Sequence, residues 1–70
     1  MLDELPMSKD EAIKAMRDGM KVTHRHFSSE EWMKETGRLY EFEDGCLCEF
    51  EEFWRYREDD SWLEGWKIFQ

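Results

Sequence analysis

The segment Leu39–Phe50 constrains the fold most, because it has the pattern of a β-hairpin. Its central dipeptide, Asp44-Gly45, is typical of a two-residue type I′ turn, in which both central residues need φ > 0. Strand-forming residues flank the dipeptide on both sides. A two-residue turn gives the following cross-strand pairs: Glu43 with Cys46, Phe42 with Leu47, Glu41 with Cys48, and Tyr40 with Glu49.

This register predicts which side of the hairpin is buried, because cross-strand partners share a face of the sheet. One face carries Tyr40, Phe42 and Leu47, and the other carries Glu41, Glu43, Cys46 and Cys48. An isolated hairpin is marginally stable in water. The apolar face is therefore expected to pack against a partner layer.

The segment before the hairpin predicts a helix over Lys9–Asp18. Ser8 and Glu11 have the spacing of a capping box, and Gly19 stands where a helix commonly ends. The apolar residues Ala12, Ile13 and Met16 form a narrow stripe, so this helix should pack on one side only. Residues 1–7 are expected to form an irregular lead-in.

Alternating residues predict a strand over Met20–His26 and a last strand over Trp62–Phe69. Between them, Ser28–Glu31 has a second capping-box pattern and predicts a single helical turn. The residues Phe50, Phe53, Trp54 and Arg57 have helical spacing and predict a short second helix. The expected fold is a single α+β domain, with the first helix packed on a small twisted antiparallel sheet of about four strands.

Composition limits the partners of this 70-residue chain. Its 18 acidic residues exceed its 10 basic residues, and the formal net charge of −8 opposes non-specific binding to nucleic acid or anionic membranes. We therefore expect no direct nucleic-acid binding and no membrane association. A domain this small has modest stability, so a homodimer or larger assembly through a sheet edge is expected. Asp3 and Glu4 lie where a signal peptide would be basic, which predicts a cytoplasmic protein with free thiols.

Two histidines and two cysteines allow a zinc hypothesis. His24 with His26, and Cys46 with Cys48, have a two-residue spacing that places each pair on one face of a strand. This spacing does not match the common zinc knuckle, so we expect no metal site. A cysteine nucleophile is not expected either, because Glu41 and Glu43 would raise the thiol pKa. The chain is expected to be non-enzymatic and to carry no cofactor.

The acidic residues of the second half suggest a different hypothesis. A rigid negative surface can occupy a site built for the phosphate backbone, so the chain could act as a DNA mimic that inhibits a host nucleic-acid enzyme. The alternative is that this charge only keeps an aromatic-rich protein soluble. The residues of this expected acidic face are Glu41, Glu43, Glu49, Glu51, Glu52, Asp59 and Asp60.

Aromatic residues beside arginines suggest a nucleotide site. Trp32 and Trp54 are candidates to stack on a base, while a nearby arginine holds a phosphate. The alternative is that most of the tryptophans fill the core of this small domain.

Two motifs also resemble a group of short phage-encoded proteins. The first runs from Glu11-Ala12 to Gly19-x-Lys21-Val22-Thr23, with an aromatic residue at Phe27, and the second is Trp62-x-x-Gly65-Trp66-x-Ile68. Together they resemble the family that includes Thoeris anti-defence proteins, which sequester cyclic nucleotide signals, and an anti-CRISPR protein. The chain departs from the family pattern where Phe27 replaces a tryptophan, where Gly65 replaces an acidic residue, and where a long middle insertion is missing.

The resemblance implies that Thr23, Arg25 and Phe27 lie near a ligand or subunit interface, with Trp66 and Ile68 in the core. It also implies a phage-encoded anti-defence protein that captures a host immune component, either a nucleotide second messenger or a defence protein. The DNA mimic is the alternative, and a metal-stabilised regulatory module is a third hypothesis.

Overall fold

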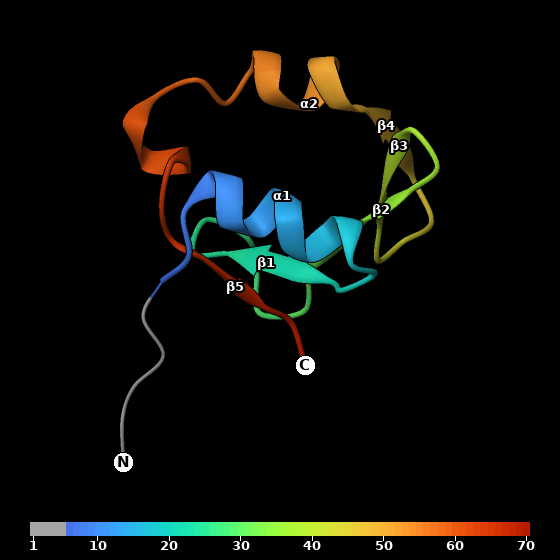
Figure 1. Ribbon diagram of the computed structural model, residues 1–70, viewed down its shortest axis with the longest axis horizontal. Helices are drawn as coiled ribbons and strands as arrows, with labels where there is room; N and C mark the ends of the chain where they lie inside the picture. The colour runs from blue at the N-terminus through green and yellow to red at the C-terminus, as the bar shows by residue number, and fades with distance from the viewer. Residues whose placement is uncertain (1–5) are drawn as a thin grey trace.

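The computed structural model describes residues 6–70, which form an α+β domain with one antiparallel sheet (Figure 1). The expected lead-in at residues 1–7 falls mostly outside the described residues. The helices are α1 (Lys9–Arg17) and α2 (Phe50–Arg55), with a short 3₁₀ helix η1 (Asp60–Trp62). The strands are β1 (Val22–His24), β2 (Met33–Thr36), β3 (Leu39–Phe42), β4 (Leu47–Glu49) and β5 (Trp66–Ile68).

The α+β fold class is confirmed, but the sheet has five strands in the order β4-β3-β2-β1-β5, where about four were expected. The additional strand is β2, which follows the segment where Ser28–Glu31 predicted a helical turn. Half of that capping box forms, because the Ser28 N–H donates to Glu31 Oε1 at 2.7 Å. The chain then extends and Met33 pairs with both Val22 and Phe42, so strand pairing replaces further helix.

Helix α1 begins and ends as its sequence predicts. The Ser8 hydroxyl accepts from the Glu11 N–H at 3.2 Å, and the Glu11 carboxylate accepts from the Ser8 N–H at 2.9 Å. At the other end, Gly19 has φ of 92°, and the Met20 N–H donates to the Ala15 carbonyl. This Schellman geometry stops the helix and turns the chain into β1.

The register of the β3–β4 hairpin differs by one residue from the predicted one. Tyr40 pairs with Cys48 and Glu41 pairs with Leu47, because the loop has three residues, Glu43-Asp44-Gly45, instead of two. Only Gly45 has positive φ, which is the geometry of a turn followed by a bulge and not of a type I′ turn. A shift of one residue moves every side chain of β4 to the opposite face. Leu47 is consequently exposed, and Cys48 lies opposite Tyr40 on the core side.

Both helices pack on the same face of the sheet, which we call the covered face. Its central residues are Val22, Met33, Tyr40 and Trp66, joined by Ala12 and Met16 from α1 and by Phe53 from α2. The Trp54 indole N–H donates to the Tyr40 hydroxyl at 2.8 Å, and the rings of Trp54 and Trp66 are 5.6 Å apart. Trp66 and Ile68 lie on this face as expected, while the strand that carries them begins only after Gly65, whose φ is 89°.

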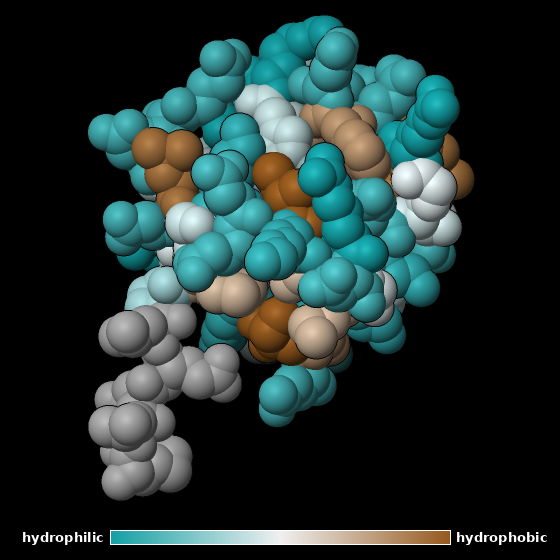
Figure 2. Space-filling view, in the orientation of Figure 1, coloured by the Kyte–Doolittle hydropathy of each residue, from teal (hydrophilic) through white to brown (hydrophobic). Residues whose placement is uncertain are grey.

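The opposite face of the sheet, which we call the open face, carries no helix. Alternation along the strands places Thr23, Lys34, Glu41 and Lys67 there. Figure 2 shows that hydrophilic side chains cover most of the visible surface of the molecule and that hydrophobic residues form separate patches. Within residues 6–70, no helix is long and apolar enough to cross a membrane.

Replacing Tyr40 with phenylalanine tests the hydrogen bond that joins α2 to the sheet. The Y40F change leaves the Trp54 indole N–H without its acceptor, so the free energy of unfolding should fall by about 1 kcal/mol in urea denaturation. Tyr56 is 75% exposed and provides the matched control, because Y56F should leave stability unchanged. Equal stability of Y40F and wild type would contradict the role given to this bond.

Candidate functional site

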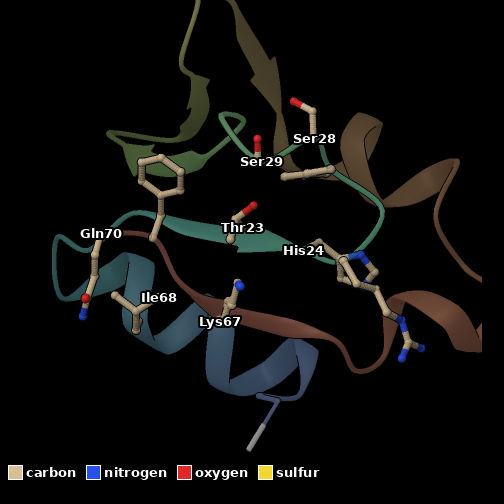
Figure 3. A pocket seen from close by; sticks show the side chains of 10 residues that line it. Thr23, His24, Ser28, Ser29, Lys67, Ile68 and Gln70 are labelled. Carbon is tan, nitrogen blue, oxygen red and sulfur yellow. The ribbon is translucent and has the colours of Figure 1, made fainter. Parts of the chain in front are cut away.

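A groove of about 540 Å³ lies on the open face of the sheet. It lies over β1 and β5 and is bounded by the loop that follows β1 (Figure 3). The lining residues are Thr23, His24, Arg25, Phe27, Ser28, Ser29, Lys67, Ile68, Phe69 and Gln70. None of these residues is acidic, although the chain as a whole carries a formal charge of −8.

Strand alternation explains how the polar side chains reach the groove. Thr23 and Lys67 are paired across β1 and β5, so their side chains share a face. Figure 3 shows both pointing away from α1, while Ile68 points toward it. The groove floor is therefore a hydroxyl group beside an ammonium group.

Arg25 adds a second cation at the end of β1. The backbone N–H of Arg25 donates to the Gly65 carbonyl at 3.0 Å, and the Arg25 side chain lies across the backbone of Gly65. A Cβ at position 65 would come within 3.0 Å of the Arg25 Nε and 3.1 Å of its Cδ. Gly65 is therefore required both for its φ of 89° and for the position of the arginine.

The Ser28-Ser29 turn supplies two more hydroxyl groups above β1. The Glu31 carboxylate holds this turn by accepting from the Ser28 N–H at 2.7 Å, while the Glu31 N–H donates to the Ser28 carbonyl at 3.1 Å. The Glu31 carboxylate thus makes a local hydrogen bond within the turn.

The loop also depends on His24, which is 2% exposed and points to the covered face. Its Nε2–H donates to the carbonyls of Ser61 at 3.0 Å and Glu64 at 2.7 Å. Its Nδ1 accepts from the His26 N–H at 3.0 Å. One nitrogen donates and the other accepts, so the ring is the neutral Nε2–H tautomer.

Burial lowers the pKa of His24 below the ordinary histidine value of 6.5, and the neighbouring His26 and Arg25 charges lower it further. The carbonyls of Glu64 and Ser61 act in the opposite direction without reversing the shift. The ring also stacks on Trp62 at 4.3 Å and meets the edge of Trp66 at 4.6 Å. His24 is therefore a structural histidine that connects β1 to the segment before β5.

Of the five ligand-binding residues expected from the sequence, three line the groove: Thr23, Arg25 and Phe27. Phe27 is half-buried, and its ring also meets Trp66 edge-on at 5.8 Å, so it separates the groove from the core. Trp32 does not line the groove but contacts Phe69, which does, with ring centroids 6.5 Å apart. Trp54 lies on the covered face, bonded to Tyr40, and is not brought to the groove.

Sequence reasoning missed Ser28, Ser29, Lys67 and Phe69 as groove residues. Lys67 and Phe69 do alternate with the core residues Trp66 and Ile68, and that pattern places them on the face shared with Thr23 and Arg25. The two serines were interpreted as part of a helix-capping motif, so the sequence did not indicate that they line the groove.

The expected acidic face is divided in the structure. Glu49, Glu51 and Glu52 gather at the β4–α2 junction, around a hollow of about 280 Å³ that also contains Arg38 and Arg55. Glu41 lies on the open face within 3.8 Å of Lys34. Glu43 lies in the hairpin loop, and Asp59 and Asp60 lie at η1. These carboxylates therefore occupy several separate places, with arginine and lysine between some of them.

The residues of the zinc hypothesis are not brought together. His24 lies on β1, whereas Cys46 and Cys48 lie in the hairpin at β4, and β2 and β3 separate these strands. Among residues 6–70, no three His, Cys, Asp or Glu side chains are placed to hold a metal ion. The pKa of the Cys46 thiol is raised mainly by Asp44, with a smaller effect of Glu43, and that of Cys48 is raised mainly by burial. The direction expected for the thiols is therefore found, with Glu43 as a minor cause and Asp44 and burial as the main ones.

No protein-family model, no curated protein and no solved structure matches this chain.

The buried His24 predicts a pH dependence of stability. A folded-state pKa below 6.5 means that the unfolded chain binds a proton more readily, so the free energy of unfolding should decrease as pH falls below 6.5. The measurement is urea denaturation between pH 7.5 and 5.5, with the C–H resonances of the His24 ring followed by NMR. The variant H26Q removes the other histidine and should keep this dependence. A His24 ring that titrates above 6.5 would contradict the assignment.

Proposed function

We propose that this protein is a non-enzymatic binding protein that captures a nucleotide signal of a host defence system, as a phage-encoded anti-defence protein. The observation that carries the proposal is the groove, which joins two cations, hydroxyl groups and aromatic rings on a chain of net negative charge. Within residues 6–70, neither Arg25 nor Lys67 forms a salt bridge, so both charges are free for a ligand.

The chemistry of the groove suits a phosphorylated ligand with an aromatic base. Arginine and lysine bind phosphate oxygens through charge-assisted hydrogen bonds. The hydroxyl groups of Thr23 and Ser28 can donate hydrogen bonds to a phosphate, or donate to and accept from a sugar hydroxyl. Phe69 gives an aromatic wall on which a base can stack. A volume of about 540 Å³ lies in the usual range for a small-molecule site.

The DNA-mimic alternative stays a prediction. It requires an acidic surface that replaces a phosphate backbone, and arginines 38 and 55 interrupt the densest group of carboxylates. If no nucleotide binds, an inhibitory activity that disappears at high salt would favour this alternative.

A thermal-shift titration with nucleotides tests the proposal directly. A ligand at about 100 times its Kd stabilises the folded state by roughly 2.7 kcal/mol, which raises the Tm of a domain of this size by roughly 10 °C or more. The variant R25A should lose most of this shift, measured against its own ligand-free Tm. R38A removes an exposed arginine outside the groove and should show the same ligand-induced rise in Tm as the wild type. A wild-type protein whose Tm stays constant with every nucleotide, or an unchanged shift in R25A, would overturn the proposal.

Replacing Gly65 with alanine tests how Arg25 is positioned. G65A combines a strained positive φ with a clash against the Arg25 side chain, so it should reduce both stability and ligand affinity. Gly45 has a similar φ of 86° and no atom within 4 Å of an added Cβ. G45A should therefore reduce stability while the affinity of the folded protein stays at the wild-type level, as calorimetric titration can show. Equal affinities of G65A and G45A would contradict the positioning role.

A further inference from the structure

A second aromatic surface lies next to the groove on the open face. Trp32, just before β2, is half-buried, and the ammonium group of the exposed Lys21 lies 4.3 Å from its ring centroid. Phe69, just after β5, packs against Trp32, and the centroids of the two rings are 6.5 Å apart. We call Lys21, Trp32 and Phe69 the Trp32 shelf.

The shelf and the groove are continuous, because Phe69 belongs to both. Lys21 and Thr23 alternate along the same chain segment, and the Phe69 N–H donates to the Lys21 carbonyl at 2.9 Å. A ligand that occupies the groove can therefore extend toward Trp32 without leaving the open face.

The charges on this part of the sheet match a chain of phosphates. Lys21, Arg25 and Lys67 form no salt bridge within the described residues, whereas Lys34 is within 3.8 Å of Glu41. Unpaired cations alternating with aromatic rings on an uncovered sheet are the arrangement that binds single-stranded nucleic acid, in which bases stack and phosphates meet positive charge.

We propose that the open face binds a short single-stranded oligonucleotide, with one nucleotide in the groove and the next base on the Trp32 shelf. This inference rests on the proposed function and extends it from a single nucleotide to a ligand of two or three. The phosphates meet Arg25 and Lys67, and the first base stacks on Phe69. The second base displaces the Lys21 ammonium from the Trp32 ring, and Lys21 then turns to a phosphate. Stacking accepts any base, because every base has an aromatic face.

The acidic remainder of the protein limits the length of the ligand. Beyond Trp32 the open face continues to Lys34 and Glu41, which lie within 3.8 Å of each other, and then to Glu49 on β4. The group of unpaired cations therefore ends at Lys21, and the carboxylates that follow disfavour phosphate. A long strand would leave the three cations and cross this acidic region. Affinity should therefore increase over the first two or three nucleotides and then stay constant. Binding of so short a ligand departs from the expectation of no direct nucleic-acid binding, whereas the formal charge of −8 still opposes non-specific binding of longer nucleic acid.

Calorimetric titration with 5′-phosphorylated oligodeoxythymidylates of one, two, three and six nucleotides tests the inference at fixed salt. We expect the dinucleotide to bind on the order of tenfold more tightly than the mononucleotide, from one added stacking contact and one added phosphate contact, and the trinucleotide to bind at least as tightly as the dinucleotide. The hexanucleotide should bind no more tightly, per site, than the trinucleotide.

Variants of the shelf separate this inference from the proposed function. K21A should reduce the advantage of the trinucleotide while the affinity for the mononucleotide stays unchanged. W32A should reduce the same advantage and can also weaken mononucleotide binding, because Phe69 of the groove packs against Trp32. K21A changes an exposed side chain, so it supplies the result even if W32A folds poorly. K14A, on the exposed side of α1, is the matched control and should behave as wild type. If all lengths bind equally, the extended site is wrong and the groove remains. If no length binds, the oligonucleotide site is wrong, and the thermal-shift titration with other nucleotides decides the proposed function.

Discussion

The neutral side chain of His24 is the interaction on which the other parts of this domain depend. A single buried ring donates to two carbonyls of the segment before β5 and accepts from the first loop residue after Arg25. It also completes an aromatic cluster with Trp62 and Trp66. Neighbouring strand residues point to opposite faces, so burying His24 on one face directs Thr23 and Arg25 to the other. The core and the groove are therefore set by the same strand.

The sheet also separates charges that composition alone mixes together. The formal charge of −8 is a sum over the whole chain, whereas a ligand responds to the charges within about a Debye length, near 8 Å at physiological salt. Many of the acids lie in the hairpin, at the β4–α2 junction and at η1, and no acidic side chain lines the groove over β1 and β5. The nearest carboxylate that the hydrogen bonds place is that of Glu31, which accepts from the backbone N–H of the lining residue Ser28 at 2.7 Å. An acidic protein thus carries a local basic surface, and the net charge governs solubility and non-specific contacts more than it governs this site.

The hairpin shows how a strong local signal can predict an element correctly and its register wrongly. Asp-Gly suits a two-residue turn, and it equally suits a three-residue loop whose last residue has positive φ. Here Asp44 accepts a hydrogen bond from the Cys46 N–H at 3.0 Å, and only Gly45 adopts the left-handed conformation. Tyr40 and Phe42 stay on the covered face in either register, so the core signal could not decide between them. Only their partners changed: Tyr40 pairs with Cys48 instead of Glu49, and Leu47 pairs with Glu41 instead of Phe42.

By itself the sequence determined the elements that short-range forces stabilise: α1 with its caps, α2 with its apolar spacing, the hairpin, and the alternation of β1 and β5. Through a resemblance to a phage family, the sequence also suggested Thr23, Arg25 and Phe27, which the structure places in the lining of the groove. Tertiary structure decided the strand at Met33–Thr36, the hairpin register and the burial of His24. It also decided that Ser28, Lys67 and Phe69 line the same groove as Arg25. Capping and periodicity act within one or two turns of the chain, whereas strand pairing and burial depend on partners far away in the sequence, such as Met7 with Trp66 and His24 with Glu64.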